Sequence, residues 1–234
     1  MKKQISKRVI FLVISVILIS CIVITPSAND VRKVYSKNRN KIGQVALTFD
    51  DGPHPRYTRD ILNILEEYHI TATFFVIGVN ATLYPEALDD IVTSGCEIGN
   101  HTFTHENLRS YCGNDIKKEL YECEAAINER VKIKTKLFRP PQGAYTKVLE
   151  NIAESMGYDI ILWSIDTMDW AHTPANNIVD NVLKSLSNGD IILMHDYVSG
   201  KNTTCEALRI LIPEILKRGY EFVTVSELIS GESA

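Results

Sequence analysis

Two adjacent carboxylates follow an apolar stretch early in the chain. The apolar run of residues 45–49 leads directly into Asp50 and Asp51, which are followed by Gly52 and Pro53. Asp-Gly-Pro forms turns readily, but a turn does not require both acids. Because side-by-side carboxylates repel each other unless a cation is shared between them, the pattern indicates more than a turn. We therefore expect acid–base or metal-binding chemistry here, with a simple turn as the alternative.

A pair of histidines has the spacing of metal ligands. His101 and His105 are four residues apart and follow the strand-like run of residues 97–99. On a helical turn such a pair faces one side, which is a common way to place two imidazoles on zinc. The spacing alone also occurs by chance. Two histidines and one carboxylate would leave a coordination position open, so a catalytic metal site is favoured over an inert structural zinc.

Three further polar segments follow apolar runs. Arg139 opens a Pro-rich turn, Asp166 begins a segment that contains a second acid and ends at Trp170, and His195 follows four apolar residues. Taken singly, these residues are readily explained as a surface Arg, a helix-capping acid and a histidine at the core edge. Five such segments in one chain instead favour a single site.

The elements that would position these residues alternate between strand and helix. Strand-like runs cover residues 45–49, 73–77, 97–99, 137–138, 160–164, 191–194 and 222–225. Helix-like stretches cover residues 58–68, 84–93, 114–130, 146–156, 174–187 and 205–218. This alternation predicts an α/β fold with a parallel sheet, either open or closed into a barrel. In both architectures catalytic and ligand-binding residues lie at the carboxyl ends of the strands, which is where the polar segments of this chain are expected.

Composition limits the classes of protein that fit. The chain has 234 residues, of which 45% are apolar and 23% charged, so it can bury a substantial core and extensive disorder is excluded. The net charge of -4 argues against a general nucleic-acid binder. The charge is uneven, because residues 1–41 contain nine Lys or Arg and one acid.

The N-terminal segment has the pattern of a targeting sequence. Basic residues precede the apolar run of residues 9–24, which predicts a signal peptide or membrane anchor over residues 1–28. An uncleaved anchor is favoured, with a signal peptide cleaved near Ala28 or a lipoprotein signal at Cys21 as alternatives. Residues 29–41 are interpreted as a basic linker, either solvated or bound to anionic lipid or wall polymer. Residues 42–230 form the expected catalytic domain.

The cysteines leave the redox compartment open. Cys96, Cys112, Cys123 and Cys205 lie outside the apolar N-terminal run and form no CxxC motif. They are compatible with two disulfides or with four thiols, and we favour mostly unpaired cysteines.

Five segments in chain order resemble the motifs of a known family. These segments are residues 48–53 (TFDDGP), 101–105 (HTFTH), 139–143 (RPPQG), 166–170 (DTMDW) and 193–195 (LMH). They resemble the ordered motifs of the polysaccharide deacetylases, the NodB-homology family, which is also called family four of the carbohydrate esterases. The resemblance covers about residues 42–230, and five ordered motifs make it highly specific.

The resemblance implies a fold, a metal and a reaction. It implies a distorted (β/α) barrel, expected to have seven strands, with a groove over one end. It implies a divalent metal held by Asp51, His101 and His105, usually zinc, with cobalt, manganese or nickel as alternatives. It also implies hydrolysis of N-acetyl groups on polymers that contain N-acetylglucosamine. A metal would polarise the acetamide carbonyl and acidify a water molecule.

Catalytic roles also follow from the resemblance. Asp50 would be the general base, and Arg139 beside it would orient the carboxylate. His195, as imidazolium, would protonate the departing amine. Asp166 would pair with His195 and raise its pKa.

Three further residues would contact the substrate. A backbone N–H near Gln142 would help to hold the oxyanion. Trp170 and Leu193 would form the sides of the groove. Many relatives have an aromatic residue where this chain has Gln142, so contacts to the sugar are expected to differ. His54 follows the Asp-Asp-Gly-Pro turn and is a weaker candidate for the groove.

Other classes of protein explain the motifs less well. A metal phosphoesterase would usually require more ligands or a glycine-rich phosphate loop. A serine hydrolase is disfavoured because the sequence contains no GxSxG motif. A non-catalytic sugar-binding relative would be expected to lose the base or the acid, and Asp50 and His195 are both present. An esterase that acts on acetylated xylan shares the motifs and stays an alternative.

The expected substrate follows from the predicted location. An exported or anchored domain at the cell surface would meet peptidoglycan, so we predict a peptidoglycan N-acetylglucosamine deacetylase, with chitooligosaccharide or another poly-N-acetylglucosamine second. The expected partners are an acetylated glycan polymer and, through the N-terminal segment, the cell membrane. The sequence indicates neither a nucleic acid nor a protein partner.

Overall fold

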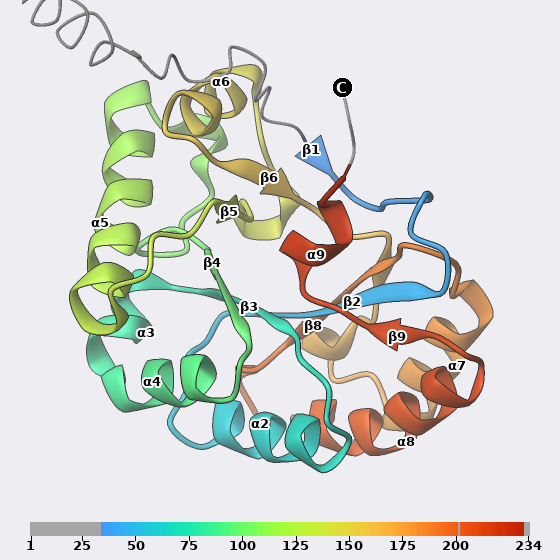
Figure 1. Ribbon diagram of the computed structural model, residues 1–234. Helices are drawn as coiled ribbons and strands as arrows, with labels where there is room; N and C mark the ends of the chain where they lie inside the picture. Colours follow the sequence, from blue (N-terminus) through green and yellow to red (C-terminus); the bar gives the residue numbers. More distant parts are fainter. Residues whose placement is uncertain (1–33, 201, 232–234) are drawn as a thin grey trace, which may run out of the picture. The chain divides into compact units, whose positions relative to one another are not determined.

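The computed structural model describes residues 34–200 and 202–231 (Figure 1). The predicted signal or anchor segment at residues 1–28 lies outside the described residues. Across the described ranges, no helix combines the length and apolarity needed to cross a bilayer. The four cysteines in these ranges, Cys96, Cys112, Cys123 and Cys205, are free thiols, which confirms the prediction that most are unpaired.

A parallel sheet forms the centre of the fold. Its strands are β1 (Val34–Tyr35), β2 (Gln44–Asp50), β3 (Thr73–Val76), β4 (Glu97–Asn100), β5 (Leu137–Phe138), β6 (Asp159–Ile161), β7 (Ile165–Asp166), β8 (Ile191–His195) and β9 (Glu221–Phe222). Eight of them lie in the order β1-β6-β5-β4-β3-β2-β8-β7, and β9 pairs with β2. Every paired couple is parallel. The expected parallel α/β fold is therefore confirmed.

Helices follow most strands and surround the sheet (Figure 1). They are α2 (Tyr57–Glu67), α3 (Gly78–Leu83), α4 (Pro85–Thr93), α5 (Gly113–Val131), α6 (Lys147–Ser155), α7 (Ala175–Ser185), α8 (Thr204–Lys217) and α9 (Val225–Ile229). Three short 3-10 turns are η1 (Leu108–Ser110), η2 (Pro141–Gly143) and η3 (Asp169–Ala171). The six helices expected from the sequence are present, and α3 and α9 are additional.

The sheet is curved, as shown by side chains that pack together on one face although their strands are separated in the strand order. Along β2 alternate residues point to opposite faces. Ala46 packs in one cluster with Phe75 and with residues of β5, β6 and β8, which defines an inner face. Leu47 and Phe49 pack in the other large cluster, with the helices. Asp50 has the parity of Ala46, so its side chain emerges at the carboxyl end of the inner face.

Helix α9 covers the opposite end of this inner face. Its buried residues Val225 and Leu228 belong to the same inner cluster. The N–H of Val225 donates to the Thr73 side chain and the N–H of Ser226 donates to Glu97, and these two partners are the first residues of β3 and β4. Helix α9 thus covers the amino ends of the strands on this face, and the candidate site lies at their carboxyl ends.

The strand count differs from the expected seven. The predicted strand at residues 160–164 ends at Ile161 as β6, which pairs with β5. The separate strand β7 follows at residues 165–166 and pairs with β8, and β1 is also additional. Between β6 and β7 the buried Arg139 guanidinium donates to the carbonyls of Ile161 (3.2 Å) and Leu162 (3.1 Å), taking acceptors that a neighbouring strand would use. The chain from β6 to β7 therefore connects strands near opposite ends of the strand order. The curved sheet is a half-barrel, which is consistent with the expected distorted barrel.

The chain ahead of β2 belongs to the folded unit in its described part. Residues 34–41, which the sequence predicts to end a basic linker, include β1, which pairs with β6. Lys37 forms an ion pair with the buried Asp190 at 2.5 Å, and the buried Asn38 donates to the Leu228 carbonyl at 2.8 Å. The boundary expected at residue 42 is therefore too late, because these residues contribute buried polar contacts.

Candidate metal centre and catalytic groups

Polar side chains converge at the carboxyl ends of β2, β4, β5 and β8. Asp50 ends β2 and pairs in register with His195, the last residue of the adjacent β8. His101 directly follows β4, and Arg139 directly follows β5. The sequence therefore predicted correctly that these residues meet at one edge of the sheet.

Asp51, His101 and His105 form a compact group of ligand atoms. The Asp51 Oδ1 atom lies 3.4 Å from His101 Nε2 and 3.2 Å from His105 Nε2. Two ligand atoms on a tetrahedral zinc, each about 2.0–2.1 Å from the metal, are separated by about 3.3–3.4 Å. The spacing of the three side chains therefore fits a zinc-sized ion with a position left open.

Two further observations support a cation at this group. Asp51 Oδ1 is buried and has no hydrogen-bond partner, although a buried carboxylate oxygen normally has one. His101 Nδ1 donates to the Arg139 carbonyl at 2.7 Å, which leaves Nε2 unprotonated toward Asp51 in the neutral ring. Burial alone would raise the pKa of Asp51, but its contacts with His101 and His105 outweigh burial and hold that pKa below its ordinary value.

The histidine pair lies on a loop, so the expected helical turn is wrong. Residues 101–105 have no helical assignment, and Thr102 and His105 have φ angles of 69° and 63°. The N–H of Thr102 donates to the Asn100 side chain, and the N–H of His105 donates to the Thr102 hydroxyl. These side-chain bonds fold the backbone back on itself, which brings the two rings to 4.9 Å between centroids.

Asp50 and Arg139 form a buried ion pair beside this group. Arg139 Nη1 donates to Asp50 Oδ1 at 2.6 Å and to the Thr48 hydroxyl at 2.9 Å. The guanidinium carbon lies 4.0 Å from the centroid of the Phe75 ring, so the cation is stacked as well as hydrogen-bonded. Asp50 Oδ2 points to the ligand group and lies 3.6 Å from His101 Nε2. One carboxylate oxygen is therefore fixed by Arg139, and the other faces the site.

His195 pairs with Asp169 and not, as expected, with Asp166. His195 Nδ1 donates to Asp169 Oδ1 at 2.7 Å, and the His195 N–H donates to Asp169 Oδ2 at 2.8 Å. The Thr204 hydroxyl donates to the same Asp169 Oδ2 at 2.9 Å. Asp166 instead accepts the N–H of Met168, which is the local turn bond typical of an aspartate that ends a strand.

The pairing with Asp169 changes the charge of His195. Burial would lower the pKa of this imidazole, but the hydrogen bond and negative charge of Asp169, with further contributions from Asp50 and Asp51, outweigh it. The net effect raises the pKa of His195 to about 9. In the absence of a bound cation the ring is an imidazolium at neutral pH, and its Nδ1–H donates a hydrogen bond to Asp169.

The sequence and the fold are similar to those of known proteins. A family model described as polysaccharide deacetylase matches residues 37–161, which is more than half of the chain. The chain belongs to the polysaccharide deacetylase family.

Similar members of this family include proteins with named substrates. The peptidoglycan-N-acetylglucosamine deacetylase of Bacillus cereus is 38% identical over 194 residues, which is 82% of this chain and 90% of the relative. The chitooligosaccharide deacetylase of Sinorhizobium fredii is 36% identical over 188 residues, covering 75% and 87%. A solved peptidoglycan N-acetylglucosamine deacetylase has a TM-score of 0.81 at 33% identity, covering 84% of this chain and 92% of that one.

The residues expected to contact substrate lie in different surroundings in this family member. Trp170 is half exposed, on η3 directly after Asp169, and Leu193 is buried in β8. Gln142 is exposed in η2 with a φ of 59°, and its side-chain oxygen accepts a hydrogen bond of 2.9 Å from Asn107. The contacts of these three residues with a glycan stay predictions.

Sequence reasoning missed two buried carboxylates that contact the site loops. Asp196 accepts a hydrogen bond from the Thr58 hydroxyl, and burial raises its pKa to about 7 with help from the charges of Asp51 and Asp50. Glu119 on α5 bonds to the loop that carries the two histidines. The position of Asp196 next to His195 was a usable signal. Helical periodicity places Glu119 on the inner side of α5 but does not indicate which groups it contacts there.

Proposed function

We propose that this protein hydrolyses the N-acetyl groups of N-acetylglucosamine in peptidoglycan, releasing acetate and leaving a free amine on the sugar. The observation that carries the proposal is the arrangement at the strand ends. A carboxylate fixed by Arg139 and an imidazole fixed by Asp169 lie on adjacent strands, next to three side chains spaced as metal ligands. Amide hydrolysis uses a base, an acid and an electrophile, and this edge of the sheet offers the first two together with ligands that would hold a cation as the third.

Asp51, His101 and His105 would hold a divalent cation, with zinc as the first choice because nitrogen and oxygen ligands and an open position suit it. When bound, the cation supplies Lewis-acid polarisation of the acetamide carbonyl and lowers the pKa of water. The unpartnered Asp51 Oδ1 and the Nε2 atoms of the two histidines are the donor atoms that this proposal uses. Cobalt, manganese and nickel accept similar ligands and stay alternatives.

Asp50 would act as the general base. Its Oδ1 is held by Arg139, so Oδ2, which faces the ligand group, is the oxygen that can accept a proton from the attacking water. Arg139 is itself held in place, because its guanidinium stacks on Phe75 and bonds to Thr48 and to two backbone carbonyls. It therefore keeps the Asp50 carboxylate in a fixed orientation. The carboxylate is thereby preorganised for proton transfer.

His195 would act as the general acid. Because Nδ1 donates to Asp169, Nε2 carries the proton available to a substrate. As the carbonyl C–N bond breaks, this proton passes to the departing amine nitrogen, while the water oxygen stays bound to the acyl carbon as acetate. Asp169 holds the ring orientation throughout and stabilises the imidazolium.

The remaining site residues would bind the glycan. A backbone N–H near Gln142 would hold the oxyanion, and Trp170 and Leu193 would contact the sugar or the acetyl methyl group. The half-exposed Trp170 supports this role, since aromatic rings provide large flat contact surfaces. The predicted location at the cell surface, with membrane attachment through residues 1–28, supports peptidoglycan as the acetylated polymer within reach.

The substrate is tested by mass spectrometry of acetyl loss. The full-length zinc-loaded chain is incubated with peptidoglycan, with chitooligosaccharide and with acetylated xylan, and chelated protein and Asp50→Asn serve as controls. Acetyl loss from peptidoglycan N-acetylglucosamine, absent in both controls, is the expected result. Loss from chitooligosaccharide alone would keep the reaction and overturn the wall substrate. Loss from xylan alone would assign an O-deacetylase, and no loss with zinc bound would assign a binding role.

A further inference from the structure

The loop between the two histidine ligands is held by one buried carboxylate. Glu119 Oε2 accepts the N–H of Phe103 at 3.0 Å and the N–H of Thr104 at 2.9 Å. Glu119 Oε1 accepts the Thr104 hydroxyl at 3.0 Å. Both carboxylate oxygens therefore bond to the two residues that lie between Thr102 and His105.

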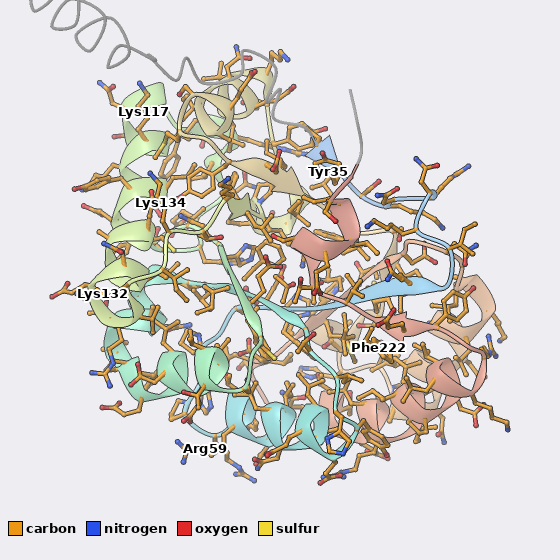
Figure 2. All side chains as sticks on the ribbon, viewed as in Figure 1. Tyr35, Arg59, Lys117, Lys132, Lys134 and Phe222 are labelled. Carbon is orange, nitrogen blue, oxygen red and sulfur yellow. The ribbon has the colours of Figure 1, made fainter. Side chains whose placement is uncertain are left out.

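Glu119 is a charged residue on the buried side of α5, where the other buried residues are apolar. Helix α5 is amphipathic, with buried residues Ile116, Leu120, Cys123 and Ile127 facing inward. Lys117 and Lys132 lie at the outer side of the molecule, as Figure 2 shows. Glu119 lies on the inward side with 8% of its surface exposed. Burying a carboxylate away from water is unfavourable unless hydrogen bonds replace the solvent, and Glu119 accepts three such bonds from the loop.

The opposite side of the loop is held by α3. The N–H of Gly78 donates to the Thr102 carbonyl and the N–H of Val79 donates to the Phe103 carbonyl, both at 3.0 Å. A Cβ atom at Gly78 would lie 2.4 Å from the Phe103 ring, so this contact is close. The loop is thus clamped, with its carbonyls on α3 and its N–H groups on Glu119.

We propose that Glu119 is a positioning residue that sets the affinity of the site for zinc. The inference rests on the proposed metal role of Asp51, His101 and His105. Thr102 and His105 both adopt positive φ angles, a conformation that costs free energy in residues other than glycine and persists only where the surroundings enforce it. Phe103 and Thr104 lie between Thr102 and His105, and their hydrogen bonds to Glu119 hold the backbone in this conformation.

The effect falls mainly on His105. His101 is buried and is tied separately through Nδ1 to the Arg139 carbonyl. The His105 side chain is about one third exposed, so its position depends more on the course of the loop backbone. Without Glu119 the backbone at residues 103–105 relaxes, and the His105 ring no longer meets Asp51 at a ligand-like separation. Loss of outer contacts that orient metal ligands costs about 10- to 100-fold in metal affinity.

The test compares zinc affinities of full-length variants, measured by competition with a chromophoric chelator. Glu119→Ala removes all three bonds and is expected to weaken zinc binding about 10- to 100-fold. Glu119→Gln keeps an oxygen for the two N–H groups and an amide for the Thr104 hydroxyl to bond, so its zinc affinity is expected within about threefold of wild type. Glu129→Ala, an exposed acid on the same helix, is the matched control and should leave zinc binding unchanged.

Thermal unfolding of the metal-free proteins separates positioning from general stability. A role limited to folding would lower the Tm of metal-free Glu119→Ala and leave the zinc Kd unchanged, which would overturn the proposal. An equal loss of zinc affinity in Glu119→Gln or in Glu129→Ala would overturn it as well. If wild type binds no zinc, or His105→Ala binds zinc as tightly as wild type, the proposed metal site itself is wrong.

A second variant applies if Glu119→Ala does not fold. Thr104→Val removes only the hydroxyl bond and is expected to weaken zinc binding about threefold. An unchanged Kd for this variant would refute the inference.

Discussion

Replacing Asp169 by Asn should lower the proton affinity of His195. It also places an amide NH2 group where Asp169 Oδ2 accepts the His195 N–H and the Thr204 hydroxyl. The substitution keeps the size of the side chain and an oxygen that can accept the His195 Nδ1 proton, but removes the negative charge 2.7 Å from that nitrogen. Asp169 is almost fully buried, so its charge is poorly screened by solvent. His195 should therefore lose most of what stabilises its imidazolium form.

The magnitude follows from the two opposing effects on this imidazole. Burial lowers the pKa of His195, and Asp169 is the main group that raises it to about 9. Without that charge the pKa should return to the ordinary 6.5 or below. A fall of 2.5 pH units corresponds to about 3 kcal/mol between the two protonation states. In the metal-free protein at pH 7.5 the protonated fraction of His195 would fall from about 97% to about 10%. Because the reaction needs the protonated ring as its acid, acetate release at this pH should also slow.

The assay is the pH dependence of acetate release. A bound cation opposes protonation of His195, so the alkaline limb of the wild-type profile is expected at or below pH 9. In Asp169→Asn this limb should move down by about two pH units. Asp166→Asn is the matched control, since Asp166 bonds to the Met168 N–H and not to His195. A limb that moves with Asp166→Asn, or stays in place with Asp169→Asn, would refute the pairing.

Stability of the metal-free protein gives a second readout with a defined sign. The pKa of His195 is raised in the folded state, so its contribution is complete below pH 6.5 and is lost as the pH rises to about 9. Over that range the wild-type free energy of unfolding should fall by about 3 kcal/mol relative to Asp169→Asn. Chemical denaturation at several pH values measures this difference, and parallel curves for the two proteins would contradict it.

Four other substitutions test separate parts of the site. Asp50→Asn should retain zinc and lose acetate release by about 100-fold or more, since it removes the base but no ligand; loss of zinc without loss of rate would overturn this assignment. His101→Ala and His105→Ala should each lose zinc, measured by metal analysis after dialysis, and full occupancy in either would refute the ligand assignment. Gly52→Ala should lower the free energy of unfolding by about 1–3 kcal/mol, because its Cβ would lie 2.0 Å from Asp196 Oδ2; an unchanged denaturation midpoint would count against that contact.

The sequence predicted which strand ends carry the chemistry because topology decides it. In a parallel sheet the residues directly after each strand meet at one edge, so Asp50, His101, Arg139 and His195 could be brought together without knowledge of any side-chain contact. The assignment of Asp51, His101 and His105 as metal ligands came from the resemblance to the family, and it stays a prediction.

Details that depend on loop conformation could not be predicted in this way. Asp166 and Asp169 are both acids in one motif, and only the path of the chain through Met168, with a φ of 58°, brings Asp169 to His195. The break between β6 and β7 has a similar origin, because the guanidinium of Arg139, which follows β5, bonds to the carbonyls of Ile161 and Leu162. Glu119 was missed because helical periodicity places it on the inner face without indicating what it meets there.

Acetate release as a function of bound zinc tests the central claim most directly. Metal-free full-length protein is titrated with zinc, and acetate released from peptidoglycan and zinc bound per chain are measured on the same samples. We predict no release without metal, a rate that rises with zinc and levels off at about one zinc per chain, and no rate above background for Asp50→Asn at the same zinc content. Full activity in the metal-free protein, or undiminished activity in zinc-loaded Asp50→Asn, would contradict the account.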